Sequence, residues 1–492
     1  MEVHERVFEI ALNRLFFYPS NEIYEARAGF YDYGPVGIRI KRNIERLWRE
    51  VFIEEEDAYE VSSAVVTPEI VLQASGHVDE FTDPLLECAH CHYKVRADKI
   101  VEELEGKAWN GDMEELREKL KGFKCRRCGK EAGSNIYKSN LMFSTAIGYD
   151  GDKAYLRPET AQGIFTSFDR NFKSLGATLP IAIGQVGRSF RNEISPRRGL
   201  IRLREFHQME LEYFMDPQKQ EHKNFEKLKD VKMAFMHRGA NEVVEETPST
   251  LVEKEVCSGV FAYFLAKEWL FMKRVGLDVK RMWFRHLEEG ETPHYSGGNI
   301  DLEVETSYGI VEVAGNAYRK DYDLSRHAQF SKKNLSVKEE DGREFIPHVF
   351  EVSIGLERTL FSMLEHTFVE KGERKWAWFR FTHEIAPYMV ALYPLLSNNE
   401  EIVKMAKKVR EELKGKLPLY YREKGSIGRR YAKADEIGIP YAITVDHESL
   451  EDGTVTIRDR DSGEQVRVAV EDIVERIMKS GVAGEVIDGR KG

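Results

Sequence analysis

Hydrophobic and polar positions follow a helical period in the first part of the chain. Residues 1–30 and the stretch that begins near Val36 repeat apolar positions at helical spacing, with a Gly/Pro turn between them. The next stretch, "YEVSSAVVTPEI", indicates a strand that is closed by Pro68. We therefore predict helical segments followed by a strand.

Strand patterns dominate the middle of the chain. They occur in "AYLRP", "IAIGQVGRSFRNE" and "GLIRLREFHQMELEYF", and these strands lack the intervening helices that a parallel sheet needs. The pattern predicts an antiparallel sheet with a hairpin around "ISPRRG". Alternation in "LIRLREF" would place Arg202, Arg204 and Phe206 on one face of a strand.

The later pattern divides the chain into several units. Residues 217–290 read as a charged helical insertion, sheet patterns resume in "NIDLEVETSYGIVEVAG" and "HVFEVSIG", and a boundary falls near 376–386. Beyond it, strand and helix patterns alternate. We predict an α+β protein whose units are a sheet domain (1–84, 134–216 and 291–380), a Cys-paired insertion (85–133), the helical insertion (217–290) and a C-terminal α/β domain (386–492).

Length and composition agree with such a division. The 492 residues correspond to about three to four domains. The hydrophobic fraction of 42% and the charged fraction of 32% exclude a mostly disordered chain. The sequence contains no run of 18 or more apolar residues, the length that is needed to cross a bilayer. The N-terminus lacks the basic start, apolar middle and cleavage site of a signal peptide, so we expect a cytoplasmic protein without membrane contacts.

Charge is distributed unevenly. The net charge is -11, but residues 404–433 hold eleven Lys/Arg against three Asp/Glu. An anionic partner could bind there, and a solvated helix face is the alternative.

Four of the five cysteines form two C-x-x-C pairs, Cys88 with Cys91 and Cys125 with Cys128. In a reducing compartment, such pairs are typical of a tetrahedral Zn²⁺ site because each turn aims two sulfurs at one metal ion. Disulfides are the weaker interpretation. We predict a structural zinc ion in a small subdomain, and a packing role for Cys257.

The stretch "RSFRNEISPRRGLIRLREF" (188–206) contains six arginines and no lysine. A guanidinium group binds phosphate or carboxylate with two parallel hydrogen bonds and stacks on flat rings, whereas lysine is a point charge. A hairpin of this kind could hold a polyphosphate while Phe206 covers a base. Taken alone, the stretch also fits a surface hairpin whose arginines pair with acidic neighbours.

Three stretches together resemble the class II aminoacyl-tRNA synthetases. "RSFRNE" through "REF" resembles their motif 2, "IGLER" (354–358) their motif 3, and the helix and strand ending at Pro68 their motif 1. More specifically, "YDYGPVG", "YLRPETAQGIF", "HYSGGNIDLE" and "GSIGRRYAKADEIGIPY" resemble the homodimeric type of glycyl-tRNA synthetase. The likeness covers about residues 5–480. It implies an antiparallel β-sheet catalytic domain flanked by helices, and a C-terminal α/β anticodon-binding domain.

The resemblance implies an ATP-dependent ligase that forms glycyl-adenylate and then charges tRNA(Gly), with Mg²⁺ as the companion of ATP. Arg191 would bind the α-phosphate and the substrate carboxylate, and Phe206 and Arg358 would cover the two faces of adenine. Arg191, Arg358 and Glu312 would carry catalysis, with Glu351 as a further candidate for magnesium. The implied ATP-binding residues are Arg191, Asn192, Glu193, Arg202, Leu203, Phe206, Glu312, Val313 and Arg358.

For glycine, the resemblance implies an acidic pocket made of Glu159, Glu210, Glu351, Val352 and Ser353. Glycine has no side chain to recognise, so an enzyme must hold its ammonium group and exclude larger amino acids. In the C-terminal domain, Arg429, Arg430 and Tyr431 would contact the anticodon stem-loop. The family also implies a homodimer formed through motif 1.

Three residues depart from the family pattern: Val352 stands where proline is usual, Tyr318 where polar residues are commoner, and Glu357 where motif 3 is less charged. These departures would affect how the implied site residues are positioned. Two other functions remain open, a non-catalytic binding protein of the same fold and an enzyme that activates alanine or serine. The retained Arg191, Arg202 and Arg358 argue against the first.

Overall fold

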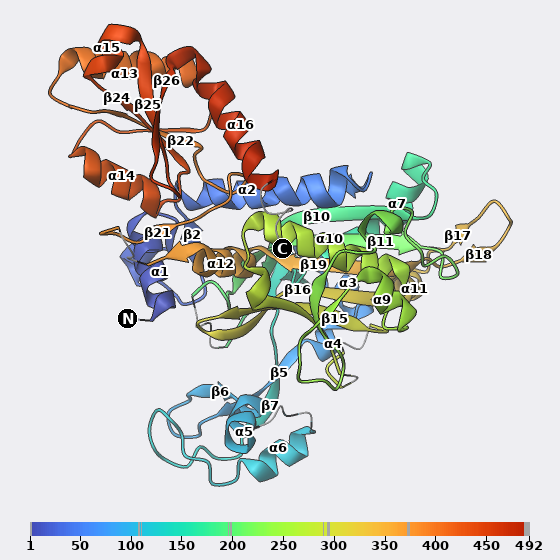
Figure 1. Cartoon of the computed structure of the whole chain (residues 1–492). Helices are drawn as coiled ribbons and strands as arrows, with labels where there is room; N and C mark the ends of the chain where they lie inside the picture. The colour runs from blue at the N-terminus through green and yellow to red at the C-terminus, as the bar shows by residue number, and fades with distance from the viewer. Residues whose placement is uncertain are drawn as a thin grey trace.

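The computed structural model describes residues 2–106, 109, 111–194, 196, 199–288, 290–292, 296–370 and 374–486 (Figure 1). A large sheet and its helices form the centre of the molecule, the Cys-containing unit extends from one side, and the C-terminal unit lies on the opposite side. Arg197 and Arg198 of the motif 2 loop, together with His294 of "HYSGG", lie outside the described residues. Within the described part of the chain, we find no helix with the length and apolar character that a bilayer crossing requires.

A nine-stranded sheet supports the central unit. Its strand pairs are antiparallel except for β12 with β14 and β10 with β3, which are parallel. The predicted antiparallel sheet is therefore confirmed. In spatial order the strands are β13 (Val244–Glu246), β12 (Met233–Met236), β14 (Met282–His286), β15 (Asn299–Thr306), β16 (Gly309–Lys320), β19 (His348–Gly355), β11 (Glu205–Met215), β10 (Ile181–Phe190) and β3 (Tyr59–Glu60).

The arginine-rich hairpin consists of β10 and β11, as the pattern predicts, but its second strand begins only at Glu205. The predicted strand alternation in residues 200–204 is wrong. Leu200, Ile201 and Leu203 are all buried, which a strand of period two cannot achieve on one face. This segment is therefore irregular and lies beside the sheet. Arg202 belongs to it and not to a strand.

Helices cover the sheet. Helix α10 is buried on nearly all sides, and Phe264 on it stacks on Phe350 of β19 at 5.5 Å between ring centroids. The expected helical insertion at 217–290 therefore needs correction, because it contains α10 and also adds β12, β13 and β14 to the sheet. The covering helices are α2 (Gly37–Arg49), α7 (Ala161–Leu175), α9 (Pro248–Glu253), α10 (Gly259–Val275), α11 (Tyr322–Ser331) and α12 (Leu356–Thr367).

The N-terminal region is less helical than predicted. Helix α1 ends at Asn13, and β1 (Phe17–Pro19) pairs with β2 (Tyr31–Tyr33). The predicted strand before Pro68 consists of two short pieces, β3 and β4 (Val66–Pro68). β4 joins a small sheet with β9 (Asp152–Leu156) and β8 (Phe143–Ile147).

The Cys-containing unit folds around a hydrophobic cluster of its own, which includes Ile100, Val101 and Leu116. It follows α3 (Glu69–Ala74) and α4 (His77–Glu80), and consists of β5 (Thr82–Glu87), β6 (Lys94–Arg96), α5 (Ala97–Glu105), α6 (Met113–Lys119) and β7 (Ile136–Asn140). β5 and β7 pair antiparallel and connect the unit to the central sheet domain.

The C-terminal unit is a five-stranded mixed sheet with a separate core, as predicted from its alternating pattern. Its elements are β22 (Val390–Pro394), α13 (Glu400–Leu413), β23 (Leu419–Tyr421), α14 (Ile427–Glu436), β24 (Tyr441–Val445), α15 (His447–Asp452), β25 (Thr454–Asp459), β26 (Gln465–Ala469) and α16 (Ile473–Val486). Short elements elsewhere are α8 (Phe225–Leu228), β17 (Val337–Lys338), β18 (Glu344–Phe345), β20 (Phe368–Val369) and β21 (Trp378–Phe379).

Candidate active site

A cavity of about 330 Å³ opens on one face of the nine-stranded sheet. Strands β11, β15, β16 and β19 supply its floor, and residues 200–203 form part of its wall. Twelve of the fourteen residues predicted to bind ATP or glycine line it: Glu159, Arg191, Glu193, Arg202, Leu203, Phe206, Glu210, Glu312, Val313, Glu351, Ser353 and Arg358.

The strand register explains why these residues meet. Glu210 lies opposite Ser353, Ser353 opposite Gly315, and Gly315 opposite Asp301, which gives one row across four strands. Directly opposed residues point to the same face of a sheet. Glu351, two positions before Ser353, therefore faces the same cavity.

Val352 and Asn192 do not line the cavity. Val352 points to the opposite face of β19 and belongs to the main hydrophobic core. The exposed Asn192 donates a backbone hydrogen bond to Leu141 O at 2.6 Å. The departure from proline at position 352 therefore affects packing rather than the lining of the site.

One end of the cavity is cationic and aromatic. The Arg191 guanidinium lies over the ring of Phe206 at 5.2 Å and over that of Phe81 at 5.4 Å. Its Nε donates to Pro158 O at 3.2 Å. Arg191 is thus held between two rings next to the residue that precedes Glu159.

Two more arginines at this end are paired with acidic cavity residues. Arg202 donates to Glu193 at 2.6 Å. Arg358 donates to the backbone of Glu312 at 2.8 Å, and its Nη1 lies 3.5 Å from the Glu312 carboxylate. Side chains of Arg202 and Arg358 keep 32% and 35% exposure, so a bound anion can compete for them.

The other end is acidic and closed. Glu210 accepts hydrogen bonds from Thr160 N at 2.9 Å, Gln208 Nε2 at 2.6 Å and Ser353 Oγ at 2.8 Å. Burial raises the pKa of Glu210, and the charge of Glu159 adds to this effect. Gln208 Oε1 is buried and has no hydrogen-bond partner among the described residues.

A buried arginine, which the sequence patterns did not single out, organises this end. Arg319 binds Asp323 with two hydrogen bonds, at 2.7 and 2.9 Å, and donates to Glu351 at 2.8 Å. Burial raises the pKa of Glu351 to about 8, with Glu210 and Glu159 adding to this and Arg319 opposing it. The pocket therefore holds more carboxylates than the described cations around them balance, which suits a ligand that brings a positive charge.

Glu159 differs from its neighbours. It is nearly buried, its Oε1 accepts from Gln162 Nε2 at 2.9 Å, and its Oε2 lies 3.3 Å from His77 Nε2. Burial alone would raise the pKa of Glu159, but His77 and Arg319 outweigh it and hold that pKa below the usual value. Of the three glutamates at this end, Glu159 is therefore the one whose surroundings favour the ionised form.

Glu312 and Asp301 face each other across Gly315. A side-chain carbon added at Gly315 would lie 3.6 Å from Asp301 Oδ1 and 3.9 Å from Glu312 Oε1. Burial raises the pKa of Asp301 to about 8, and the nearby Glu312 adds to this. Glu351, the other magnesium candidate, is instead engaged by Arg319 at the closed end.

Glu357 of motif 3 has a structural partner set. It accepts from His207 N at 2.7 Å and from Tyr33 Oη at 2.9 Å, and lies 2.7 Å from the His207 ring. This buried carboxylate joins "YDYGPVG", β11 and the start of α12 beside Arg358. Glu357, the second departure from the family pattern, therefore connects the "YDYGPVG" stretch, motif 3 and strand β11, which begins within motif 2.

The third departure is Tyr318. Its hydroxyl group lies 2.8 Å from Gln220 Nε2.

The predicted tRNA contacts lie on α14, and two of them have partners inside the C-terminal unit. Arg430 donates to Pro394 O at 2.6 Å and to Leu395 O at 3.1 Å, and the Tyr431 hydroxyl lies 2.5 Å from Thr444 Oγ1. Arg429 is exposed. A neighbouring crevice of about 420 Å³ is lined by basic and aromatic residues, including Arg14, Tyr388, Tyr420, Arg422, Lys424 and Lys433.

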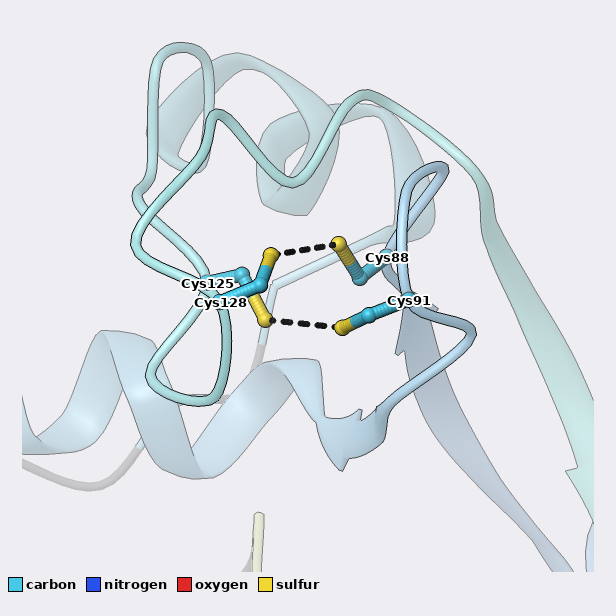
Figure 2. Close-up of side chains that lie close together, drawn as sticks. All are labelled: Cys88, Cys91, Cys125 and Cys128. Atoms are coloured by element: carbon cyan, nitrogen blue, oxygen red, sulfur yellow. Dashed lines mark hydrogen bonds between the residues drawn. The ribbon is translucent and has the colours of Figure 1, made fainter.

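The four paired cysteines converge in the Cys-containing unit, where Figure 2 shows their side chains pointing toward one another. All four sulfurs lie within 4.8 Å of one another, with Cys88–Cys128 at 3.7 Å and Cys91–Cys125 at 3.6 Å. Four thiolates at the Zn–S distance in a tetrahedron are about 3.8 Å apart. The geometry therefore fits a Cys₄ metal site, and the partly buried Cys257 packs on the main core.

Comparisons with known proteins agree with this geometry. Residues 143–367 match the class II tRNA synthetase core domain (G, H, P, S and T), and residues 389–480 match an anticodon-binding domain. The glycine–tRNA ligase of Methanothermobacter thermautotrophicus is 37% identical, covering 97% of this chain and 99% of its own. The glycine–tRNA ligase of Aeropyrum pernix is 36% identical, covering 97% of each chain.

Among solved structures, the prolyl-tRNA synthetase of Cryptosporidium parvum superposes with a TM-score of 0.59 at 12% identity. That match covers 97% of this chain and 75% of the other, and it supports the class II fold alone. The sequence relatives extend over almost the whole chain at more than a third identity. The chain belongs to the glycine–tRNA ligase family of class II aminoacyl-tRNA synthetases.

Proposed function

We propose that this chain is a glycine–tRNA ligase that works in two steps in one cavity. In the first, a glycine carboxylate oxygen attacks the α-phosphorus of ATP, the bond to the β-phosphate oxygen breaks, and pyrophosphate leaves. In the second, a terminal ribose hydroxyl of tRNA(Gly) attacks the glycyl carbonyl carbon and AMP leaves. The observation that carries the proposal is the juxtaposition of a closed acidic pocket with an arginine-lined nucleotide site in this family.

The acidic end would bind the glycine ammonium group. Glu159, Glu210 and Glu351 supply acceptors for its three N–H groups, and Ser353 and Gln208 hold Glu210 in place. A buried carboxylate gains most from a cation that replaces its lost hydration. Larger amino acids are disfavoured because their side chains would have to fit among these buried carboxylates.

The arginine end would bind ATP. Arg191, fixed by Phe206 and Phe81, is placed to bridge the α-phosphate and the glycine carboxylate. Binding of the outer phosphates would draw Arg358 and Arg202 from their carboxylate partners. These residues position the reactants and stabilise phosphoryl charge, so no dedicated general base is needed.

For magnesium, Glu312 and Asp301 are better placed than Glu351, because they share the open space beside Gly315. Two carboxylates with room for water ligands suit Mg²⁺. The ion would neutralise phosphate charge when it is bound with ATP.

The Cys₄ site would hold Zn²⁺ as a structural ion. Its sulfur spacing and all-thiolate donor set support zinc over oxygen-seeking metals. Zinc analysis of the purified protein, with titration of accessible thiols before and after chelation, tests this assignment. Absence of zinc together with four freely titrating thiols contradicts it.

Two further proposals concern partners, and a third concerns the cellular location. The basic crevice and exposed Arg429 would contact the anticodon arm of tRNA, while Arg430 and Tyr431 support the domain from inside. Tyr59, Val66 and Ile70, exposed at the motif 1 edge, would be covered in a homodimer. A cytoplasmic location fits the reducing conditions that thiolate ligands need.

Glycine-dependent exchange of pyrophosphate into ATP tests the function. We expect exchange with glycine and little with alanine or serine, followed by charging of tRNA(Gly). Equal exchange with alanine contradicts the glycine assignment. No exchange with any of these amino acids supports a non-catalytic binding protein.

A further inference from the structure

His77 lies at the junction of the Cys-containing unit and the glycine end of the cavity. It is the first residue of α4 and is 8% exposed. Its Nε2 lies 3.3 Å from Glu159 Oε2, and its Nδ1 lies 2.8 Å from Ser75 Oγ. Its ring therefore connects a buried hydroxyl to one of the proposed ammonium-binding carboxylates.

The surroundings determine where the ring carries its proton. Glu159 can only accept when ionised, so Nε2 must present its N–H toward that oxygen. Ser75 Oγ can either donate to Nδ1 or accept from it. In both arrangements Nε2 is the donor, so the contact with Glu159 is favourable for the neutral ring and for the charged ring.

Glu159 needs such support because its other neighbours give it little. Arg319 reaches no closer than 3.9 Å in the direct ion pair, and it binds Asp323 and Glu351 at shorter distances. Gln162 holds the second oxygen of Glu159 and carries no charge. The charge of Glu159 raises the pKa of the neighbouring Glu210, so each of these two carboxylates disfavours the ionised form of the other.

We propose that His77 is a positioning residue for glycine binding, which orients Glu159 and keeps it available to the ammonium group. The inference rests on the proposed function. It assigns to the α4 segment, which lies outside the synthetase motifs, a part in amino-acid affinity.

The position of His77 is itself fixed by the connection to the Cys-containing unit. Asn140, at the end of the returning strand β7, donates to the backbone oxygens of His77 at 3.3 Å and Val78 at 3.0 Å. Leu141 N donates to Phe81 O at 3.1 Å, and the Phe81 ring lies 5.7 Å from that of His77. The returning crossing from the unit therefore braces this short helix and the residue that follows it.

Substitution by glutamine or phenylalanine separates the proposed hydrogen bond from packing. His77→Gln keeps an amide N–H near the position of Nε2, whereas His77→Phe keeps a flat ring against Phe81 without a donor. We expect His77→Phe to raise the KM for glycine about tenfold or more in pyrophosphate exchange, with the KM for ATP within about twofold. His77→Gln should restore most of the glycine affinity.

The matched control is His222, whose Nε2 lies 3.2 Å from Glu56 Oε2 in another buried pair. His222→Gln should change thermal stability without changing the KM for glycine. The inference is overturned when active wild-type protein and His77→Phe share the same KM for glycine, or when the KM values for glycine and ATP rise together. Wild-type protein without glycine-dependent exchange instead contradicts the proposed function.

Ser75→Ala provides a second test if His77→Phe does not fold. It keeps the imidazole and removes the hydroxyl group that orients it. We expect a rise of about threefold in the KM for glycine, with the ATP value unchanged. An unchanged KM for glycine in folded Ser75→Ala contradicts the positioning role.

Discussion

The two ends of the catalytic cavity use opposite physical strategies. At the acidic end, Glu159, Glu210 and Glu351 are all at least nine-tenths buried and their positions are fixed by hydrogen bonds. At the arginine end, Arg202 and Arg358 are about one-third exposed and pair with carboxylates that a ligand can replace. The acidic end is preorganised for its ligand, whereas the arginines at the other end must give up their carboxylate partners when a ligand binds.

This difference follows from what each end has to recognise. Glycine offers only a small charged group, so selectivity requires a rigid pocket that is complete before binding. ATP offers many contacts, so arginines that are about one-third exposed can change partners without loss of specificity. We therefore expect the acidic end to respond mainly to pH, and the arginine end mainly to salt.

The largest effect should come from Arg191→Lys. Lysine loses the planar fork that can reach two oxygens, and it cannot lie flat between Phe81 and Phe206 in the same way. We expect adenylate formation to fall by about a hundredfold or more, measured by pyrophosphate exchange. Arg188→Lys is the control, since Arg188 is 59% exposed and pairs with Glu205 outside the cavity. Near wild-type exchange in Arg191→Lys would show that charge alone suffices.

The second largest effect should come from Glu351→Gln. The amide keeps one acceptor oxygen but loses the carboxylate charge that attracts the ammonium group, so we expect the KM for glycine to rise by about ten- to a hundredfold and the KM for ATP to stay nearly unchanged. In steady-state exchange, a parallel rise in both KM values would contradict the division of the cavity into two ends.

The same residue predicts a pH dependence. The pKa of Glu351 is raised to about 8, mainly by burial, so the empty pocket retains a proton at neutral pH. Glycine ammonium needs the ionised form, so the KM for glycine should fall as pH rises toward 8, by up to about tenfold per pH unit. Glu351→Gln should flatten this dependence. A flat wild-type profile between pH 6.5 and 8.5 would contradict it.

As pH rises, glycine binding should improve, but the stability of the folded protein should decrease. Because Glu351 has a higher pKa folded than unfolded, the folded state retains a proton that the unfolded state releases between about pH 4.5 and 8. Its contribution to stability therefore decreases as pH rises through that window. At pH 8, Glu351→Gln should melt at a higher temperature than wild type, although it binds glycine poorly.

A smaller effect is expected from Gly315→Ala. The added methyl group would make ordinary contacts with Asp301 and Glu312, so the fold should tolerate it, but it would occupy the space proposed for magnesium. We expect the Mg²⁺ concentration for half-maximal exchange to rise by about tenfold, with the KM for glycine unchanged. Gly298→Ala is the control, because no atom lies within 4 Å of its added carbon. Equal magnesium requirements in the two variants would contradict the proposed site.

The arginine end was the more predictable from sequence. Arg191, Phe206 and Arg358 lie in contiguous motifs, and their residue types indicate binding of phosphates and a base. All three line the cavity. Their actual partners were not predictable, since Arg202 pairs with Glu193 through an irregular segment that alternation assigned to a strand. Burial of three neighbouring apolar residues, not strand periodicity, shapes that wall.

The acidic end was only half predictable. Its glutamates were found through motifs, but Arg319 and His77 come from separate segments and carry no local pattern that marks them. Their roles depend on strand register and on burial, which tertiary packing decides. Helix α10 shows the same limit of sequence-based prediction. The surrounding sequence predicts a charged helical insertion, whereas α10 is almost wholly buried.

The smallest predicted effect concerns salt, and it compares the two ends directly. Between about 50 and 300 mM KCl, we expect the KM for ATP to rise by about two- to threefold and the KM for glycine to change by less than about 1.5-fold. The ATP effect stays modest because salt also weakens the Arg202–Glu193 and Arg358–Glu312 pairs that compete with ATP. The buried carboxylates are shielded from ions, so their attraction for ammonium is hardly screened. Initial rates at saturating concentrations of the other substrate measure both values, with choline chloride in place of KCl as the control for specific ions. A glycine KM that rises as steeply as that for ATP would mean that the acidic end is open to solvent when substrate binds.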